Sequence, residues 1–288
     1  MTTVTTNGED LDQPAPLEAD QPIAPGYMVI GHLHRSRNYD VYDVFSEERG
    51  CRCIVKTLIP DLEDEARVAR RLVREGKLLL RLTHPHIARA YEIVRTPRLA
   101  LVLETLTGET LAHLIDTSPR RLPVADVAHL GLHLCSAIQY LHNHNILHLD
   151  LKPSNIVSER QLAKVLDLSI ARPPGRGKRG VGTLQYMAPE QVRGDDFTTA
   201  TDVWGIGAVL FEALTSEYPF NRDVDDRDRP LVHEQIERRA ESVLVHRRVP
   251  RTFAGIIVRC LDPDGDGRPT VSGLARELSC FLNLSHVR

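Results

Sequence analysis

The stretch of sequence that decides the fold runs from His148 to Asn155 and reads HLDLKPSN. It places an aspartate at 150, a lysine two residues later and an asparagine five residues later. A carboxylate such as Asp150 can orient a hydroxyl and accept its proton, and an ammonium such as Lys152 can neutralise charge on a phosphate. The amide oxygen of Asn155 suits a hard cation. These residue types at this spacing indicate phosphoryl transfer from a metal-bound nucleotide.

Five further motifs lie before and after this stretch in a fixed order. They are Cys53–Lys56 (CIVK), Val165–Ser169 (VLDLS), Met187–Glu190 (MAPE), Asp202–Gly207 (DVWGIG) and Gly267–Thr270 (GRPT). Together with residues 148–155, they resemble the motifs of the protein kinases, from the third-strand lysine and the catalytic loop to Asp-Phe-Gly and Ala-Pro-Glu. The resemblance covers residues 26–285, and the ordered set is far more specific than any single motif.

The resemblance implies an α+β, two-lobed protein-kinase-like fold. The N-lobe and hinge, residues 26–106, would hold a five-stranded antiparallel sheet and one main helix. The C-lobe, residues 107–288, would be larger and mainly helical. Residues 1–25 contain five acidic residues and four prolines but no Lys or Arg. We expect them to form a disordered tail because they bury too little apolar surface to become ordered.

The hydrophobic pattern supports the N-lobe independently. Short apolar or alternating runs predict strands at 27–33, 40–46, 51–58, 90–94 and 99–104. A helix is predicted at 62–82, between the third and the fourth of these strands. Within that helix, Glu75 shares a face with Leu72 and Leu79, so its carboxylate lies on an apolar stripe, where ionisation is costly without a partner. The kinase resemblance supplies Lys56 as that partner. The alternative is a solvent-exposed Glu75 that reaches Arg71 or Arg74.

The resemblance also implies the roles of individual residues. The catalytic residues would be Asp150, Lys152 and Thr183, with Thr183 contacting the other two. The residues that would bind ATP are Gly31, Val41, Lys56, Glu75, Glu104, Leu106, Asn155 and Asp167. Lys56 would bind the α and β phosphates, and the backbone of 104–106 would form hydrogen bonds with adenine. Asn155 and Asp167 would ligate Mg²⁺. A lysine two residues after the catalytic aspartate is typical of Ser/Thr kinases.

Three features depart from the kinase pattern. No second or third glycine follows Gly31 in the loop that should cover the phosphates. Arg35 or Arg37 could compensate by offering positive charge to the phosphates; the alternative is that both arginines are exposed to solvent. Leu168 and Ser169 replace Phe-Gly after the metal-binding aspartate.

The third departure is Leu149, which replaces the arginine that commonly binds a phosphate on the activation segment. Between Ile170 and Gly182 that segment contains no Ser, Thr or Tyr. We therefore predict that activity does not depend on phosphorylation of this segment.

Two stretches resemble metal sites only superficially. Asp262–Gly267 starts like a calcium loop, but Gly273 stands where such a loop needs a bidentate glutamate. His142, His144 and His148 are close in sequence, but His148 has the structural position of the kinase catalytic loop. We expect neither calcium nor zinc at these residues.

The composition bounds the remaining possibilities. A net charge of −3 gives no reason to expect a nucleic-acid partner, and no run of eighteen apolar residues predicts a membrane anchor. Five cysteines without zinc-like spacing fit reduced thiols in a cytoplasmic protein, and the preference for arginine over lysine fits a GC-rich bacterial genome.

Taken together, the residues predict a serine/threonine protein kinase that uses ATP and Mg²⁺ on protein substrates, with input from a regulatory partner protein. Two alternatives remain. One is a pseudokinase that acts as a nucleotide-binding or scaffolding module, and the altered loop and Leu168-Ser169 favour it. The other is a small-molecule phosphotransferase with the same Asp-to-Asn spacing, and Met187–Glu190, Trp204 and Arg268 argue against it.

Overall fold

The computed structural model describes residues 14–159, 161–220 and 233–285, and the chain divides into two compact units. The first unit contains the chain up to Leu82 together with Arg89–Thr105, and the second contains Thr83–Ala88 and the chain from Leu106 onward. Residues 83–88 were expected in the N-lobe. They belong to the second unit because Ile87 bridges Val165 and the amide of Ala88 donates to the Val165 carbonyl.

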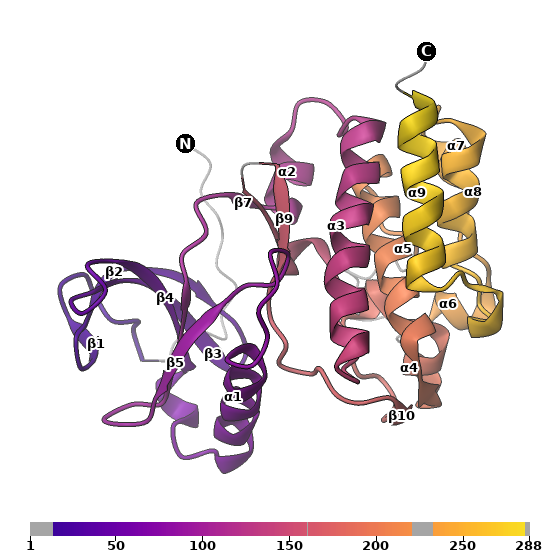
Figure 1. Ribbon diagram of the computed structural model, residues 1–288. Coiled ribbons are helices and arrows are strands. Elements are labelled where there is room, and N and C mark those ends of the chain that lie inside the picture. Colours follow the sequence, from indigo (N-terminus) through magenta and orange to yellow (C-terminus); the bar gives the residue numbers. More distant parts are fainter. Residues whose placement is uncertain (1–13, 160, 221–232, 286–288) are drawn as a thin grey trace. The chain divides into compact units, whose positions relative to one another are not determined.

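The first unit is built on a six-stranded antiparallel sheet (Figure 1). Its strands are β1 (Pro22–Ala24), β2 (Tyr27–Arg35), β3 (Tyr39–Ser46), β4 (Cys51–Leu58), β5 (Ala90–Val94) and β6 (Ala100–Glu104). They lie in the order β1-β2-β3-β4-β6-β5, so chain neighbours pair as hairpins except where β6 lies between β4 and β5. All five expected strands are present within a few residues of their predicted bounds.

The sixth strand, β1, corrects the prediction of five strands and of a disordered tail that continues to residue 25. Pro22–Ala24 pairs with the start of β2, and Ile23 and Ala24 are buried in the core of this unit, with Leu17 packed beside them. Proline, which has no backbone N–H, is tolerated here because β1 is an edge strand and pairs with a neighbouring strand on one side only. Residues 1–13 of the expected tail lie outside the described residues.

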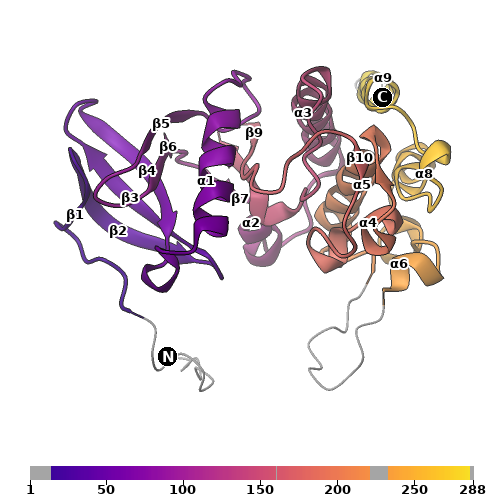
Figure 2. The ribbon, with the colours of Figure 1, turned by 90° about the horizontal axis from the view of Figure 1, so that it is seen from below.

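The two faces of the sheet bury different residues because side chains alternate along each strand. One face forms an apolar core that includes Tyr42 and Val44 of β3 and Cys53 and Val55 of β4. The opposite face, which carries Lys56 and Leu101, packs against α1 (Ala66–Leu79), as Figure 2 shows.

Helix α1 is shorter than the predicted span of 62–82. A separate 3-10 turn, η1 (Pro60–Leu62), precedes it, because Pro60 starts a tight turn after β4. Its buried residues are Leu72, Glu75, Gly76 and Leu79, so Glu75 lies on the apolar face as its spacing predicted.

The second unit is mainly helical. Its helices are α2 (Leu111–Thr117), α3 (Val124–Asn143), α4 (Pro189–Arg193), α5 (Thr199–Thr215), α6 (Glu234–Glu237), α7 (Val243–His246), α8 (Arg251–Cys260) and α9 (Val271–Ser285), with 3-10 turns η2 (Pro153–Asn155), η3 (Leu184–Tyr186) and η4 (Gly265–Gly267). Its strands are β7 (Glu109–Thr110), β8 (Ile156–Glu159), β9 (Leu162–Val165), β10 (Gly175–Arg176) and β11 (Asp196–Phe197).

Helix α5 forms the centre of this unit. Every residue from Thr201 to Thr215 is buried, which fits a sequence that is apolar on nearly all sides. Helices α3, α8 and α9 pack around it (Figure 1). None of the helices in the described part of the chain is long and apolar enough to cross a membrane.

Candidate functional site

In the first unit, Lys56 on β4 and Glu75 on α1 form a buried ion pair. The Lys56 ammonium lies 3.0 Å from Oε1 and 2.9 Å from Oε2 of Glu75. Lys56 is 7% exposed and Glu75 is 1% exposed. Removing either partner would take away the counter-charge of a buried ion, which costs about 3–5 kcal/mol. The solvent-exposed alternative for Glu75 is therefore wrong.

The close approach of α1 to the sheet makes this pair possible. A Cβ at Gly76 would lie only 2.7 Å from Ile93 Cγ1 and 3.0 Å from Leu101 Cδ1. A larger residue there would push α1 away from β5 and β6. Glycine at 76 thus places Glu75, its neighbour in sequence, within reach of β4.

The β2–β3 hairpin, where a glycine-rich loop was expected, is held by an ion pair of its own. Arg35 donates two hydrogen bonds to Asp40, at 2.7 and 2.8 Å, and His32 lies 2.9 Å from the same carboxylate. Burial alone would raise the pKa of Asp40, but its bonds to Arg35 and His32 outweigh burial and hold the pKa below its ordinary value. Arg35 is therefore engaged inside the hairpin, and Gly31 has a negative φ and open space around its Cα.

In the second unit, a buried carboxylate on α5 fixes the catalytic loop. Asp202 accepts hydrogen bonds from the backbone amides of His148 (2.9 Å) and Leu149 (2.8 Å), and its side chain lies 2.8 Å from the ring of His142. Leu149 has a φ of +70°, which a side-chain-bearing residue rarely adopts. The two bonds to Asp202 compensate for that conformation and fix the backbone directly before Asp150.

Asp150, Lys152 and Thr183 form a closed triangle of polar contacts. The Thr183 hydroxyl donates to Asp150 Oδ1 at 2.7 Å, and the Lys152 ammonium donates to Thr183 Oγ1 at 2.9 Å. Lys152 also lies 3.3 Å from Asp150 Oδ2. The structure thus brings together the three residues that were predicted to be catalytic. A carboxylate and an ammonium held this close can orient a hydroxyl and stabilise an anionic group beside it.

Asn155 lies beside the same aspartate. Its side-chain amide nitrogen donates to the Asp150 carbonyl at 3.0 Å and lies 3.3 Å from Oδ2, so its amide oxygen is the atom suited to a cation. The backbone carbonyl of Asn155 accepts from the amide of Leu166 at 2.8 Å, so Asp167 follows directly after a residue that contacts Asn155. A carboxylate and an amide oxygen are hard donors and fit Mg²⁺.

An apolar cluster occupies the place where the kinase pattern has an arginine. Leu149 packs with Leu147 and Phe197, and Ile170 and Val181 of the activation segment complete the cluster. The side-chain amide of Gln191 ties the same elements together, because it donates to the carbonyls of Leu149 and Val181, both at 2.8 Å. At this cluster the segment is therefore held by packing and neutral hydrogen bonds.

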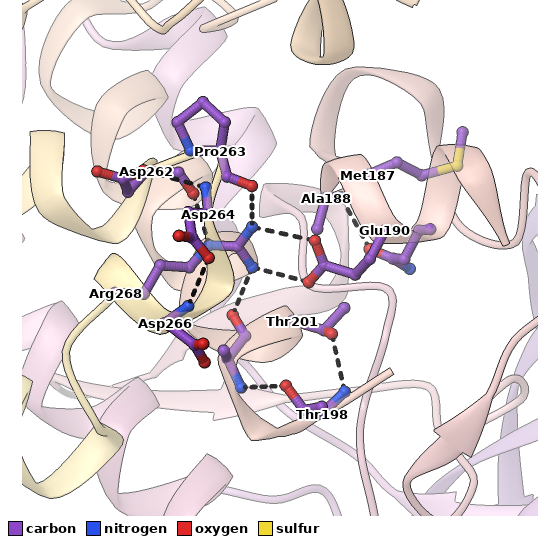
Figure 3. A network of polar contacts seen from close by, with 12 residues as sticks. Met187, Ala188, Glu190, Thr198, Thr201, Asp262, Pro263, Asp264, Asp266 and Arg268 are labelled. Carbon is purple, nitrogen blue, oxygen red and sulfur yellow. Dashed lines mark hydrogen bonds and ion pairs between the residues drawn. The ribbon is translucent and has the colours of Figure 1, made fainter. Parts of the chain in front are cut away.

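A second buried ion pair anchors the end of the activation segment (Figure 3). Arg268 donates to both oxygens of Glu190, at 2.7 and 3.0 Å, and also to the carbonyls of Asp262 and Ala200. Burial would raise the pKa of Glu190, but the Arg268 guanidinium more than offsets it and holds the pKa below its ordinary value.

The turn beside Arg268 contains the stretch that mimics a calcium loop. Asp262 and Asp264 accept hydrogen bonds from the amides of Asp264 and Asp266, respectively. These carboxylates shape the turn that presents Arg268 to Glu190 (Figure 3).

Next to the activation segment, Tyr186 donates a 2.5 Å hydrogen bond to Glu212 of α5. Burial raises the pKa of Glu212 to about 7; the bond from Tyr186 opposes that rise, and the charge of Asp116 adds to it. Glu212 therefore titrates near neutral pH.

The remaining predicted residues fall in both units. Val41, Gly31 and Glu104 lie in the first unit, and the amide of Arg89 donates to the Glu104 carboxylate at 2.9 Å. Leu106, which was expected at the end of the N-lobe and hinge, belongs to the second unit.

Two residues with clear positioning roles were missed from the sequence. Asp202 was quoted as part of a motif, but its bonds to the catalytic loop were not predicted; a carboxylate in a helix that is otherwise apolar on all sides was the available signal. Gln191 gave no such signal, because its two acceptors lie 42 and 10 residues earlier in the chain and are backbone carbonyls.

Comparisons with known proteins identify the family to which the chain belongs. A family model described as the protein kinase domain matches residues 35–278. The chain is 34% identical over 236 residues to the serine/threonine-protein kinase PkaA of Streptomyces coelicolor, which covers 78% of this chain and 42% of PkaA. It is 34% identical over 182 residues to the serine/threonine-protein kinase PknB of Mycobacterium tuberculosis, which covers 59% of this chain and 29% of PknB.

A solved structure shares the fold. The crystal structure of a mutant of the Mycobacterium tuberculosis PknI kinase domain matches with a TM-score of 0.72 at 22% identity and covers 92% of this chain and 98% of that one. The chain spans less than half the length of PkaA and PknB. On the family match and the identity to PkaA, this chain belongs to the protein kinase domain family.

Proposed function

We propose that this chain is a serine/threonine protein kinase that transfers the γ-phosphate of Mg-ATP to Ser or Thr hydroxyls of protein substrates. The observation that carries the proposal is the triangle of Asp150, Lys152 and Thr183, with Asn155 bonded to the same aspartate. This set supplies a proton acceptor, a cation and a hard oxygen donor within one hydrogen-bonded group.

In the proposed reaction, the substrate hydroxyl oxygen forms a bond to the γ-phosphorus, and the bond from that phosphorus to the β,γ-bridging oxygen breaks to release ADP. The hydroxyl proton passes to the Asp150 carboxylate, and Lys152 neutralises charge on the transferred group. Asp167 and Asn155 are the residues that would hold Mg²⁺, which supplies charge neutralisation on the phosphates.

Lys56, held by Glu75, would bind the α and β phosphates. Val41, Glu104 and Leu106 would contact the adenosine part, and Gly31 of the β2–β3 hairpin would contact the nucleotide as well. We further propose that the kinase domain spans residues 26–285, that the protein is cytoplasmic, and that a regulatory partner protein supplies its input signal.

Transfer of ³²P from ATP tests this proposal. The full chain is incubated with Mg²⁺, labelled ATP and a generic basic protein, beside the Asp150→Asn variant. We expect label on Ser or Thr with the native chain and at least a hundredfold less with Asp150→Asn.

A thermal-shift titration with ATP, together with transfer assays on protein and on aminoglycosides, separates this proposal from the pseudokinase and from the small-molecule phosphotransferase. Stabilisation by ATP without any transfer would favour a pseudokinase, and transfer to aminoglycosides instead of protein would favour a small-molecule phosphotransferase.

A further inference from the structure

Tyr39 occupies a position where the kinase pattern has no side chain. In the pattern Gly-x-Gly-x-x-Gly-x-Val, a valine at 41 puts the third glycine at 39. The glycines of that pattern allow the backbone to approach phosphate closely. Here the position carries one of the largest side chains instead, and Tyr39 as a whole residue is 6% exposed.

The tyrosine ring lies over the Lys56 ammonium. Lys56 Nζ is 4.9 Å from the ring centroid of Tyr39, within the range of a cation–π interaction. Val41 pairs directly with Lys56 across β3 and β4, so Tyr39, two residues before Val41, points to the same face of the sheet as Lys56. The Tyr39 hydroxyl lies 3.5 Å from the carbonyl of Val68 on α1, to which it donates a long hydrogen bond.

These contacts leave little of the ammonium accessible. The Glu75 carboxylate takes one side of Lys56 through two hydrogen bonds, and the ring of Tyr39 takes another. The Lys56 side chain is 9% exposed. A phosphate oxygen needs to approach an ammonium to about 2.8 Å to form a charge-assisted hydrogen bond, and an aromatic face and a phosphate compete for the same positive charge.

The backbone around Tyr39 is fixed, so the side chain is the part that can move. Tyr39 accepts a hydrogen bond from the amide of Ser36 at 2.8 Å, and its own amide donates to Ser36 Oγ at 3.1 Å. The next residue, Asp40, is held by Arg35. Opening the hairpin would break all of these bonds, whereas a rotation about the Tyr39 side-chain bonds leaves them intact and breaks the long bond from its hydroxyl to Val68.

We infer that the Tyr39 ring competes with the phosphates of the nucleotide for Lys56, so that ATP binding requires displacement of the ring. This inference rests on the proposed function, since it assigns Lys56 to the phosphates. Tyr39 is then a built-in determinant of nucleotide affinity that acts on phosphates and leaves the adenosine part untouched.

The experiment compares ATP with adenosine on the full chain. Dissociation constants are measured by calorimetry for the native chain, Tyr39→Leu and Tyr39→Phe. Leucine keeps apolar volume but lacks the aromatic face, and phenylalanine keeps the face. We expect Tyr39→Leu to bind Mg-ATP about 3- to 30-fold more tightly, the gain that follows from removing a cation–π contact. Tyr39→Phe should stay within about threefold of the native chain, and adenosine should bind all three alike.

A Lys56→Met background provides the matched control. If the ring acts through the ammonium, Tyr39→Leu should give no gain in ATP affinity once Lys56 is methionine. A gain that persists in this background, an equal gain for adenosine, or unchanged or weaker ATP binding by Tyr39→Leu would overturn the inference.

A second measurement needs no folded leucine variant. In the NMR spectrum of the native chain with carbon-13 labelled tyrosine, the Tyr39 ring signal is assigned by its absence in Tyr39→Phe. We expect this signal to shift when ATP is added and to stay in place when adenosine is added. A ring signal that ATP leaves unchanged would contradict the inference.

If the native chain transfers phosphate but these tests fail, only the role of Tyr39 is contradicted. If no form of the chain binds ATP or transfers phosphate, the proposed function falls with it.

Discussion

The hydroxyl of Thr183 donates a 2.7 Å hydrogen bond to Oδ1 of Asp150. This bond links the activation segment to the catalytic loop across 33 residues of chain. Because Lys152 donates to the same hydroxyl, Thr183 fixes the relative position of the proton acceptor and the cation. The geometry of the reacting groups therefore depends on the activation segment being in place.

Replacing Thr183 tests this dependence. Thr183→Val keeps the shape of the side chain but removes the donor, so Asp150 and Lys152 lose their common partner. We expect kcat to fall by about 10²-fold, the loss typical of misplaced reacting groups, with little change in the Kd for ATP. Steady-state kinetics on a protein substrate would measure this, with Thr183→Ser as the control that keeps the hydroxyl. A loss confined to KM would contradict the assigned role.

The Lys56–Glu75 pair gives a second prediction. Glu75→Gln leaves the Lys56 ammonium buried without its counter-charge, so we expect the free energy of unfolding to fall by about 3–5 kcal/mol and the affinity for ATP to fall with it. Urea unfolding and nucleotide titration measure the two effects. The control is Glu63→Gln, which removes a partly exposed pair with Arg98 and should cost less than about 1 kcal/mol. Equal effects of the two substitutions would show that Glu75 has no special role in stability.

Residues whose position follows from local periodicity could be predicted from the sequence. Glu75 lies three residues after Leu72 and four before Leu79, which is helical spacing, and this alone placed Glu75 on the buried face. The apolar or alternating runs at 40–46 and 51–58 likewise placed the strands β3 and β4. The ordered motifs then identified the family, because their spacing reflects one fold.

Features that depend on distant partners could not be predicted in this way. Pro22–Ala24 reads as part of a polar, proline-rich segment, and only the core beneath it makes it a strand. Arg35 was considered as a source of charge for phosphate, but Asp40, five residues later, binds it instead. Tyr39 gave no signal in the sequence because its contact with Lys56 requires two strands in register.

The apolar cluster around Leu149 predicts that the activation segment needs no phosphate. Packing of Leu149 against Phe197 and Val181, with the bonds of Gln191, already holds the segment. We expect kcat to stay within twofold after exhaustive phosphatase treatment, with loss of phosphate verified by mass spectrometry. A drop of tenfold or more that tracks a phosphate on Ser169 or Thr183 would contradict this account.

Glu212 predicts a pH dependence of stability. Its pKa rises from the ordinary value of 4.5 to about 7 in the folded chain, so between these values the folded state binds more protons than the unfolded state. Stability conferred by the protonated form is therefore lost as the pH rises from 4.5 through 7. Glu212→Gln removes this loss, and we expect it to be more stable than the native chain by up to about 3 kcal/mol at pH 8 and nearly equal to it at pH 4.5.

Urea unfolding at the two pH values measures this difference. Glu47→Gln, on an exposed turn, is the control and should show no such difference. A Glu212→Gln variant that is less stable than the native chain at pH 8 would mean that the charged carboxylate stabilises the fold.

The central claim is that Asp150 serves phosphoryl transfer to a protein hydroxyl. The most direct test is single-turnover transfer from labelled ATP, at saturating Mg-ATP and protein substrate, by the native chain and by Asp150→Asn, with the Kd for ATP measured on both. The account predicts that the rate falls by 10²- to 10⁴-fold while the Kd stays within about threefold, since Asp150 acts on the hydroxyl and not on the nucleotide. Equal rates for the two proteins, or no transfer by the native chain when it binds ATP, would contradict it.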